Sequence, residues 1–432
     1  MPSAFGAQSI VPGTGEIRIT RNTRLQWSQS AETPDAVAAL GYVLYVDEEP
    51  ADVQTATCTP VDDLPELTCD MPLPPITTGS HTLAIAAVAS TPTHRVIGPR
   101  SDTLRVRVES GTRAETLGFH ASSPAAAAPA VTAVPVADGL HDVRDMAALP
   151  DGRLLIAERG GSVRVWMGPG TTPAFALVLD DVVAAGEQGL LSVAVDPAFA
   201  SSHHVFLLYS TTEGLRVARF EETRGRLHSR AILLDALPAV PDGVLRFGPD
   251  GRLYVALGDG GHPDAARDRG TLAGKLLRVN PDGTSPDDQP PGLPIRLSGL
   301  HQPTGMAWNA DGSRMWVSER TPAGGTLGMA AADGRPAESR DLVAVGMPPG
   351  MGAASVLHCT DRDIPSLDGT VLVAADRRGG LLQLTFDADG RVSSTASLLD
   401  DLGAIRSLAA ADTGRVYVAS ADRVWRLDRA GR

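Results

Sequence analysis

Three aspartates in residues 258–268, GDGGHPDAARD, are the first candidates for chemistry in this chain. Asp259, Asp264 and Asp268 could form a cation loop, because calcium prefers carboxylate and carbonyl oxygens. Their spacing is not that of an EF-hand, and aspartate is common in turns between strands. The sequence contains no GxSxG elbow, HExxH helix or phosphate-cradling glycine loop. Because these motifs are absent, the sequence gives no indication of hydrolase, zinc-protease or nucleotide-binding chemistry.

The composition narrows the classes of partner. The 432 residues are 43% hydrophobic and 21% charged, with a formal net charge of -13. Nonspecific nucleic-acid binding needs a basic surface, which this chain lacks. No run of about 18 apolar residues is present, so we expect no membrane span. The partners to consider are a sugar or other small molecule and a protein.

Glycine and proline, 45 and 33 residues, are scattered between short apolar runs. This pattern indicates many short strands joined by turns, and therefore an all-β protein. Residues 15–109 alternate with period two around Trp27 and the strand near residues 41–46, which is typical of a sandwich of about seven strands. Residues 1–14 form an extension, and residues 110–130 form a linker rich in alanine, proline and serine.

Residues 131–432 contain a repeat. Six turn-and-strand copies such as PDGRLLIAE and PDGRLYVAL recur roughly every 45 to 60 residues, the length of one four-stranded blade. In each Asp-Gly pair, the glycine tolerates positive φ and the aspartate can bond the turn backbone. We predict a six-bladed β-propeller preceded by a small β-sandwich. The central residues of the six copies are Leu155, Phe206, Tyr254, Trp316, Leu372 and Tyr417.

The order of strands in the first unit, with HTLAIAAVAS and SDTLRVRVES at its end, resembles a fibronectin type III module. The second unit resembles the soluble quinoprotein glucose and sorbosone dehydrogenases. The matching segments include GEQGLLSVAVDPAF, LRFGPDGRLYVALGDGG, LAGKLLRVNPDG and HQPTGMAW, in this order. This resemblance implies a six-bladed propeller that holds pyrroloquinoline quinone (PQQ) and calcium and oxidises aldose sugars.

The resemblance also assigns a catalytic base, a histidine just ahead of paired glycines. With FGPDG as the anchor, that position is Val240, and valine cannot accept a proton. The paired glycines are reduced to Asp242 and Gly243. We consider His301, Glu187, Asp242 and His262 as substitute bases, with His301 first because its family position faces the cofactor.

The remaining family positions are partly kept. The cofactor-binding glutamine falls on Glu187 or, with a one-residue shift, on Gln188. Cations that could pair with the quinone carboxylates fall on Arg320, Arg377 and Arg406.

The family's calcium segment falls on residues 319–322, where Thr321 and Pro322 could supply backbone carbonyl ligands. The family's arginine and asparagine positions carry Leu300 and His301, and a second closing arginine is replaced by Ala404.

Two functions follow. The first is a quinoprotein-type oxidoreductase by descent with a diverged active site, in which Val240 argues against standard PQQ-dependent sugar oxidation. The alternative is a noncatalytic extracytoplasmic binding or assembly protein that uses the propeller and sandwich as interaction surfaces.

The cysteines bear on location. Cys58 and Cys69 are close enough in sequence to bridge two strands or close a loop, and a disulfide would imply an oxidising compartment. Cys359 lies in an apolar run and is expected to be buried. The N-terminal residues lack a basic start and an apolar stretch. Either the protein is cytoplasmic or a leader has been trimmed, and we expect a periplasmic or secreted protein.

Overall fold

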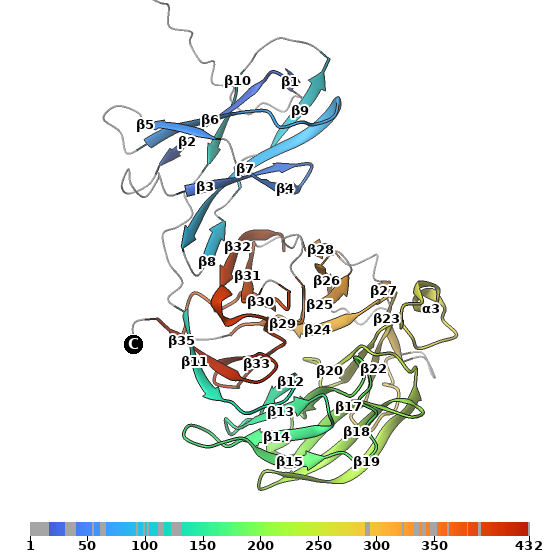
Figure 1. Cartoon of the computed structure of the whole chain (residues 1–432). Coiled ribbons are helices and arrows are strands. Elements are labelled where there is room, and N and C mark those ends of the chain that lie inside the picture. Colours follow the sequence, from blue (N-terminus) through green and yellow to red (C-terminus); the bar gives the residue numbers. More distant parts are fainter. Residues whose placement is uncertain are drawn as a thin grey trace, which may run out of the picture. The chain divides into compact units, whose positions relative to one another are not determined.

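The structure is a computed structural model. The chain forms two compact units (Figure 1): residues 1–128 with 386–397, and residues 129–385 with 398–432. The described residues are 17–30, 40–53, 56–60, 66–91, 94–97, 100–101, 103–110, 116–121, 131–289, 294–321, 324–331, 337–338, 343–345, 352–360, 363–377, 379–387 and 390–430.

The first unit is a β-sandwich. One sheet runs in the order β1-β9-β7-β8, with β3 and β4 joined to it at β7, and the other runs β10-β2-β6-β5. The strands are β1 (Ile17–Thr20), β2 (Arg24–Ser30), β3 (Leu40–Val46), β4 (Glu49–Asp52), β5 (Thr57–Pro60), β6 (Glu66–Pro72), β7 (Gly79–Thr91), β8 (His94–Ile97), β9 (Leu104–Glu109) and β10 (Thr116–Ala121). Residues 386–397 group with this unit, and β32 (Val392–Leu398) pairs with β8.

Alternation of apolar and polar residues builds the sandwich core. In β9, LRVRVE buries every second side chain, as expected for a strand with one face on the core. Trp27 is almost fully buried, and its ring packs edge to face on Tyr42 with centroids 4.8 Å apart. Such aromatic pairs add stabilisation beyond the area they bury.

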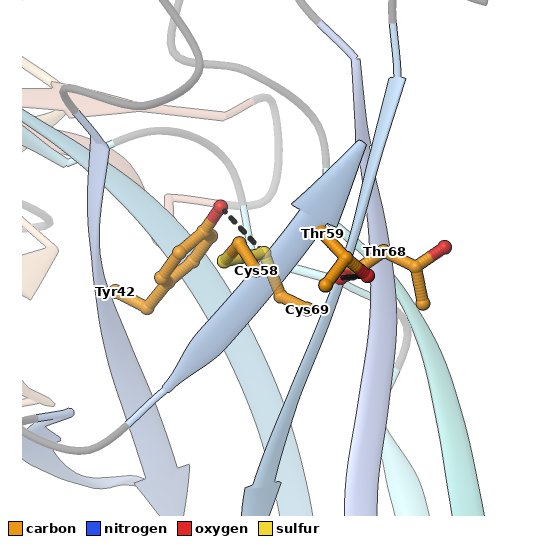
Figure 2. Close-up of a disulfide and its surroundings, with 5 residues drawn as sticks. All are labelled: Tyr42, Cys58, Thr59, Thr68 and Cys69. Atoms are coloured by element: carbon orange, nitrogen blue, oxygen red, sulfur yellow. Dashed lines mark hydrogen bonds between the residues drawn. A yellow bond between two sulfur atoms is a disulfide. The ribbon is translucent and has the colours of Figure 1, made fainter. Parts of the chain in front are cut away.

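A disulfide joins Cys58 of β5 to Cys69 of β6 (Figure 2). The two cysteines occupy facing positions of the antiparallel pair. Cys69 is fully buried, and its Sγ lies 3.3 Å from the hydroxyl of Tyr42. The sequence had left the pairing open; the bridge links two strands.

Strand β10 lies within the segment expected to be a linker. It pairs in parallel with β2 over the full length of residues 116–121. Backbone hydrogen bonds to an open sheet edge are sufficient to order such a segment, and alanine- and proline-rich composition gives no signal for them. The described part of the segment expected to be a linker is therefore a strand.

The second unit is the six-bladed propeller. Its described strands form six sheets: β12-β13-β14-β15, β16-β17-β18-β19, β20-β21-β22-β23-β27, β24-β25-β26-β28, β29-β30-β31 and β33-β34-β35-β11. Their bounds are β11 (Val131–Ala137), β12 (Val143–Ala148), β13 (Leu154–Glu158), β14 (Ser162–Trp166), β15 (Ala174–Val178), β16 (Leu190–Val195), β17 (His204–Thr211), β18 (Gly214–Thr223), β19 (Arg226–Leu237), β20 (Gly243–Phe247), β21 (Leu253–Leu257), β22 (Lys275–Val279), β23 (Ile295–Ser298), β24 (Pro303–Trp308), β25 (Arg314–Thr321), β26 (Gly324–Ala331), β27 (Ala337–Glu338), β28 (Val343–Val345), β29 (Ser355–His358), β30 (Val371–Ala374), β31 (Leu381–Phe386), β33 (Ser407–Ala410), β34 (Val416–Ala419) and β35 (Val424–Arg429).

The propeller closes on itself. Strands β12, β16, β20, β24, β29 and β33 each contact the next around the ring, and β33 returns to β12. One blade joins the two ends of the unit, because β11 pairs antiparallel with β35. We name each blade by its ring-lining strand, as the β12 blade and so on.

The predicted repeat corresponds to the second strand of each blade. All six of its central residues are buried, which confirms the predicted blade pattern. The Asp-Gly turns have the predicted geometry: in the turn before β13, Gly152 has a φ of 89°, and Asp151 accepts a hydrogen bond from the backbone N–H of Arg153.

Helix is minor in the described residues. It is confined to α2 (Phe199–Ser202), α3 (Pro263–Arg267) and the 3-10 turn η2 (Asp400–Leu402). In the described part of the chain, no helix is long and apolar enough to cross a membrane.

Candidate functional site

A cavity of about 320 Å³ lies where the ring-lining strands of the propeller begin. All six blades contribute to it, as expected where strands converge on the axis of a propeller. The lining residues are Arg144, Asp145, Glu187, Leu191, Ser192, Pro241, Asp242, Gly243, Val244, Arg246, Pro303, Thr304, Arg320, Ala354, Ser355, Asp376, Ala404 and Arg406.

An ion pair crosses between blades in this cavity. Arg246 of β20 donates to both carboxylate oxygens of Asp145 of β12, at 2.6 Å and 2.8 Å. The Asp145 carboxylate also accepts hydrogen bonds from Ser192 Oγ at 2.5 Å and Ser407 Oγ at 3.0 Å. Its side chain is only 6% exposed. Three other blades are therefore tied to the β12 blade through one carboxylate.

A second pair joins the β12 blade to the loop before β16. Arg144 Nη2 donates to Glu187 Oε2 at 2.7 Å and to the Glu187 carbonyl at 3.2 Å. The Arg144 guanidinium holds the pKa of the Glu187 carboxyl below its ordinary value. Glu187 is thus an ionised partner of a cation that the sequence analysis had not identified.

A third pair joins β25 to the segment after β30. Arg320 Nε and Nη2 donate to Asp376 Oδ2 at 3.1 Å and 3.0 Å. The other carboxylate oxygen, Oδ1, is buried with no hydrogen-bond partner in the described part of the chain. A Cβ on Gly352 would come within 1.6 Å of that oxygen, so only glycine fits beside Asp376.

The fourth cation is Arg406, which precedes β33. Its Nη1 donates to Asp142 Oδ1, and Arg159 Nε donates to Asp142 Oδ2. Arg159 also reaches the Gly186 carbonyl at 2.6 Å. The Asp142 carboxylate therefore accepts hydrogen bonds from two guanidinium groups, just beside the cavity.

Asp242 differs from the other lining carboxylates. Within the described residues, no group donates a hydrogen bond to its side chain, and burial raises the pKa of its carboxyl. The charges that act on it are the attractive Arg320 and Arg144 and the repulsive Glu187 and Asp259. It is the one lining carboxylate without a direct partner in the described chain.

Val240 lies outside the cavity lining. Its side chain is 4% exposed and belongs to an apolar cluster that includes Leu208, Leu215 and Leu257. The position that the resemblance assigns to the base therefore points into the core between strands.

A histidine–aspartate dyad lies next to Asp242. Nδ1 of His301 is 2.6 Å from Oδ2 of Asp259, whose side chain is only 3% exposed, whereas that of His301 is 48% exposed. A Cβ on Gly258 would meet the His301 carbonyl at 2.8 Å and Asp242 Cβ at 3.2 Å, so the two residues flank Gly258. The Asp259 contact leaves Nε2 of His301 as the ring nitrogen that can exchange a proton.

One further carboxylate, Glu319, contacts this dyad, and a backbone hydrogen bond holds Asp259 in place. Glu319 Oε1 accepts a hydrogen bond from the His301 backbone N–H at 2.6 Å, and burial raises the pKa of the Glu319 carboxyl. Oδ1 of Asp259 accepts the Gly261 N–H at 2.8 Å. Asp259 thus orients His301, whereas its spacing to Asp264 had suggested only a cation loop.

A buried lysine holds the loop that carries Asp259. Lys275 is fully buried, and its Nζ donates to the carbonyls of Ala265, Ala266 and Ala273 at 2.8–2.9 Å. Burial lowers the pKa of this ammonium. The lysine fixes α3 against β22 and so restrains residues 258–274.

The structure brings Glu187, Asp242, Arg320 and Arg406 to one cavity and places His301 beside it. Gln188 and Arg377 are not among the lining residues; Arg377 is exposed. Each is adjacent in sequence to a lining carboxylate, Glu187 or Asp376.

Two predicted residues are described incompletely or not at all. The calcium position Pro322 and the side chain of Thr321 lie outside the described residues. No group of three or more histidine, cysteine, aspartate or glutamate side chains in the described chain is arranged to hold a metal ion.

Sequence reasoning missed Arg144, Asp145, Arg246 and Asp376. A signal was present, because each is a charged residue in or next to a short apolar strand, where an unpaired charge is costly. Their partners could not be inferred, since Arg246 and Asp145 are 101 positions apart in the chain.

The fold and the site define a six-bladed propeller with a cavity on its axis that is lined by charged residues. Residues 140–327 match the model of the Glucose / Sorbosone dehydrogenase family. The aldose sugar dehydrogenase of Escherichia coli K12 is 32% identical over 224 residues, which cover 47% of this chain and 60% of that protein. This chain thus matches about three fifths of the length of that relative.

Two solved structures have the same propeller fold. The glucose dehydrogenase of Thermus thermophilus gives a TM-score of 0.60 at 26% identity and covers 69% of this chain and 99% of its own. The PQQ-bound aldose sugar dehydrogenase of Streptomyces coelicolor gives 0.61 at 22% identity and covers 69% and 97%. The propeller of this chain is similar to those of the glucose/sorbosone dehydrogenases, as its sequence motifs predicted.

Proposed function

We propose that this chain is a member of the glucose/sorbosone dehydrogenase-like family whose axial cavity binds a sugar but does not use PQQ to oxidise it. One observation carries this proposal: each guanidinium that lines the cavity is engaged by a carboxylate of the chain itself. The names of the relatives support a sugar as the ligand.

The residues present do not fit PQQ. The quinone is a tricarboxylate, and a partly buried anion needs cations that are free to pair with it. The lining holds four arginines and four carboxylates. Binding three more carboxylates would separate Arg144 from Glu187 and Arg320 from Asp376, and would leave two anions unpaired. For Asp376, whose side chain is 17% exposed, an unpaired charge costs several kcal/mol, whereas the 60% exposed Glu187 is screened by solvent and costs less.

The loss of the base position supports the same conclusion. Val240 is a core residue and cannot take a proton, and removal of a general base typically lowers a rate by a factor of about 10² to 10⁴. We therefore propose that the standard sugar oxidation of the family is absent or very slow in this chain.

The His301–Asp259 dyad favours a second candidate function, an enzyme with a relocated base. A histidine oriented by a buried aspartate is an arrangement able to accept a proton from a bound hydroxyl. If the protein oxidises aldoses, His301 takes the hydroxyl proton and an added quinone-type electron acceptor takes the hydride. His301→Ala should then abolish turnover and Asp259→Asn should lower it. An undiminished rate in His301→Ala would reject this role.

An extracytoplasmic location, periplasmic or secreted, is part of the proposal. The bridge between Cys58 and Cys69 supports it, because disulfides persist in oxidising compartments. We also propose that the sandwich is a fibronectin type III-like module that serves as a surface for a protein partner, with the propeller as the ligand-binding unit.

An oxidation assay tests the proposed function. The purified full chain is incubated with PQQ and calcium, and aldose oxidation is followed with an artificial electron acceptor. The E. coli aldose sugar dehydrogenase, treated in the same way, is the positive control. We expect turnover at the background level. Turnover comparable to that of the control would refute the proposal.

A further inference from the structure

When the charged residues of the cavity lining are matched in ion pairs, one carboxylate has no arginine partner. Arg246 is paired with Asp145, Arg144 with Glu187 and Arg320 with Asp376. The fourth lining arginine, Arg406, is paired with Asp142, which lies outside the lining. Of the four lining carboxylates, this leaves Asp242 without a guanidinium in direct contact.

Among the described residues, Asp242 has no direct side-chain partner. The backbone carbonyl of Asp242 accepts the Gly258 N–H at 3.0 Å, so the loop is fixed, but within the described chain its carboxylate accepts no hydrogen bond. Desolvation already disfavours its charged form, as its raised pKa indicates. Asp242 is partly exposed to the cavity, and a cavity-lining carboxylate that no described group of the chain pairs with is a candidate ligand contact.

We propose that the cavity takes a sugar that carries an ammonium group, an amino sugar, with the ammonium paired to Asp242; this inference rests on the proposed function. The cavity is of the size that suits a small ligand. The Asp242 carboxylate lacks hydrogen-bond donors and a compensating positive charge, and an ammonium group supplies both.

Other ligand charges fit less well. A neutral hydroxyl could donate to Asp242 but would leave its charge uncompensated. An acidic sugar would place a second anion beside Asp242, with the Glu187 and Asp376 carboxylates in the same lining and their arginines already engaged. Like charges brought together in a cavity are a common device for excluding the wrong ligand.

Calorimetric titration with four hexose probes of one ring type tests the inference. The probes are glucosamine, glucose, N-acetylglucosamine and glucuronate, titrated into the full chain at a pH of about 6, where the amine is protonated. A hydrogen bond to a charged group corresponds to a roughly 10- to 100-fold change in affinity. We expect glucosamine to bind more tightly than glucose by about this factor, and glucuronate to bind most weakly.

Asp242→Asn is the decisive variant, and Asp180→Asn is its control, because the Asp180 side chain is 90% exposed on the propeller surface. The preference for glucosamine over glucose should fall to near one in Asp242→Asn and persist in Asp180→Asn. Thermal unfolding of both variants verifies that they are folded.

The outcomes separate this inference from the proposed function. Binding of glucose with no gain for glucosamine, or a gain that survives Asp242→Asn, would overturn the ammonium inference alone. Absence of binding by all four probes would overturn sugar binding, and this inference with it. Equal binding of N-acetylglucosamine and glucosamine would show that charge has no role.

Discussion

At the scale of single residues, Asp242 is the lining carboxylate that no described arginine contacts. Val240, two positions earlier, packs in the core, and the chain between them turns a carboxylate into the cavity lining. The sequence predicted the loss of the base at Val240, because a motif anchors that position. It could not predict that Asp242 would lack a partner, since the neighbouring charges come from other blades.

Asp242→Asn should stabilise the protein at neutral pH. Burial raises the folded-state pKa of Asp242 above its unfolded value of about 3.9, so the unfolded state favours the ionised form more strongly. The cost of ionising Asp242 is thus fully present above the folded pKa and disappears as the pH falls through the unfolded value. We expect a gain of roughly 1–3 kcal/mol in the free energy of unfolding at pH 7.

Urea denaturation at several pH values measures this effect. The gain should shrink as the pH falls from 7 to about 3, below the unfolded pKa, where Asp242 is mostly protonated in both states. Asp180→Asn should show no such dependence. A loss of stability in Asp242→Asn at pH 7 would mean that the carboxylate has an internal partner after all.

At the scale of elements, the repeat could be predicted because local physics fixes it. A strand of alternating or wholly apolar residues after an Asp-Gly turn has the same form in each blade, as Gly152 and Gly251 show with positive φ. Strand β10 could not be predicted, because its order depends on pairing with β2 at an open edge. Contacts between blades, such as Asp145 with Arg246, likewise depend on closure of the ring.

Asp145→Asn should destabilise the propeller strongly. The substitution removes one charge of a buried bidentate pair and leaves Arg246 uncompensated, with Ser192 and Ser407 losing an ionised acceptor. Breaking a buried pair on one side typically costs about 3–5 kcal/mol. Urea denaturation should show this loss, whereas Asp180→Asn should change stability by no more than about 0.5 kcal/mol. A loss below about 1 kcal/mol would mean that the pair does not tie the blades together.

At the scale of the whole molecule, two units with different means of stabilisation share one chain. The propeller closes through β11 and β35 and through ion pairs on its axis. The sandwich has its own core around Trp27 and a covalent link between β5 and β6. The all-β architecture was predictable from composition and turn spacing. The disulfide between Cys58 and Cys69 was not predictable, because two cysteines that are close in sequence need not face each other on paired strands.

The disulfide should matter for the sandwich alone. The double substitution Cys58→Ala and Cys69→Ala removes a constraint that closes a separation of 11 residues, which in the chain-entropy view contributes about 2–3 kcal/mol. Calorimetry should show the sandwich transition at a lower temperature and the propeller transition unchanged. An unchanged sandwich transition would indicate that the bridge contributes nothing to stability.

Carboxylates of the chain itself neutralise the four arginines of the cavity. Titration of PQQ in the presence of calcium, with the wild type and a Glu187→Gln, Asp376→Asn double variant side by side, tests this neutralisation directly. We predict no saturable binding to the wild type up to about 1 mM and at least about tenfold stronger binding to the variant, in which Arg144 and Arg320 are free to pair with carboxylates. Stoichiometric binding of PQQ to the wild type at about 1 µM would contradict the account.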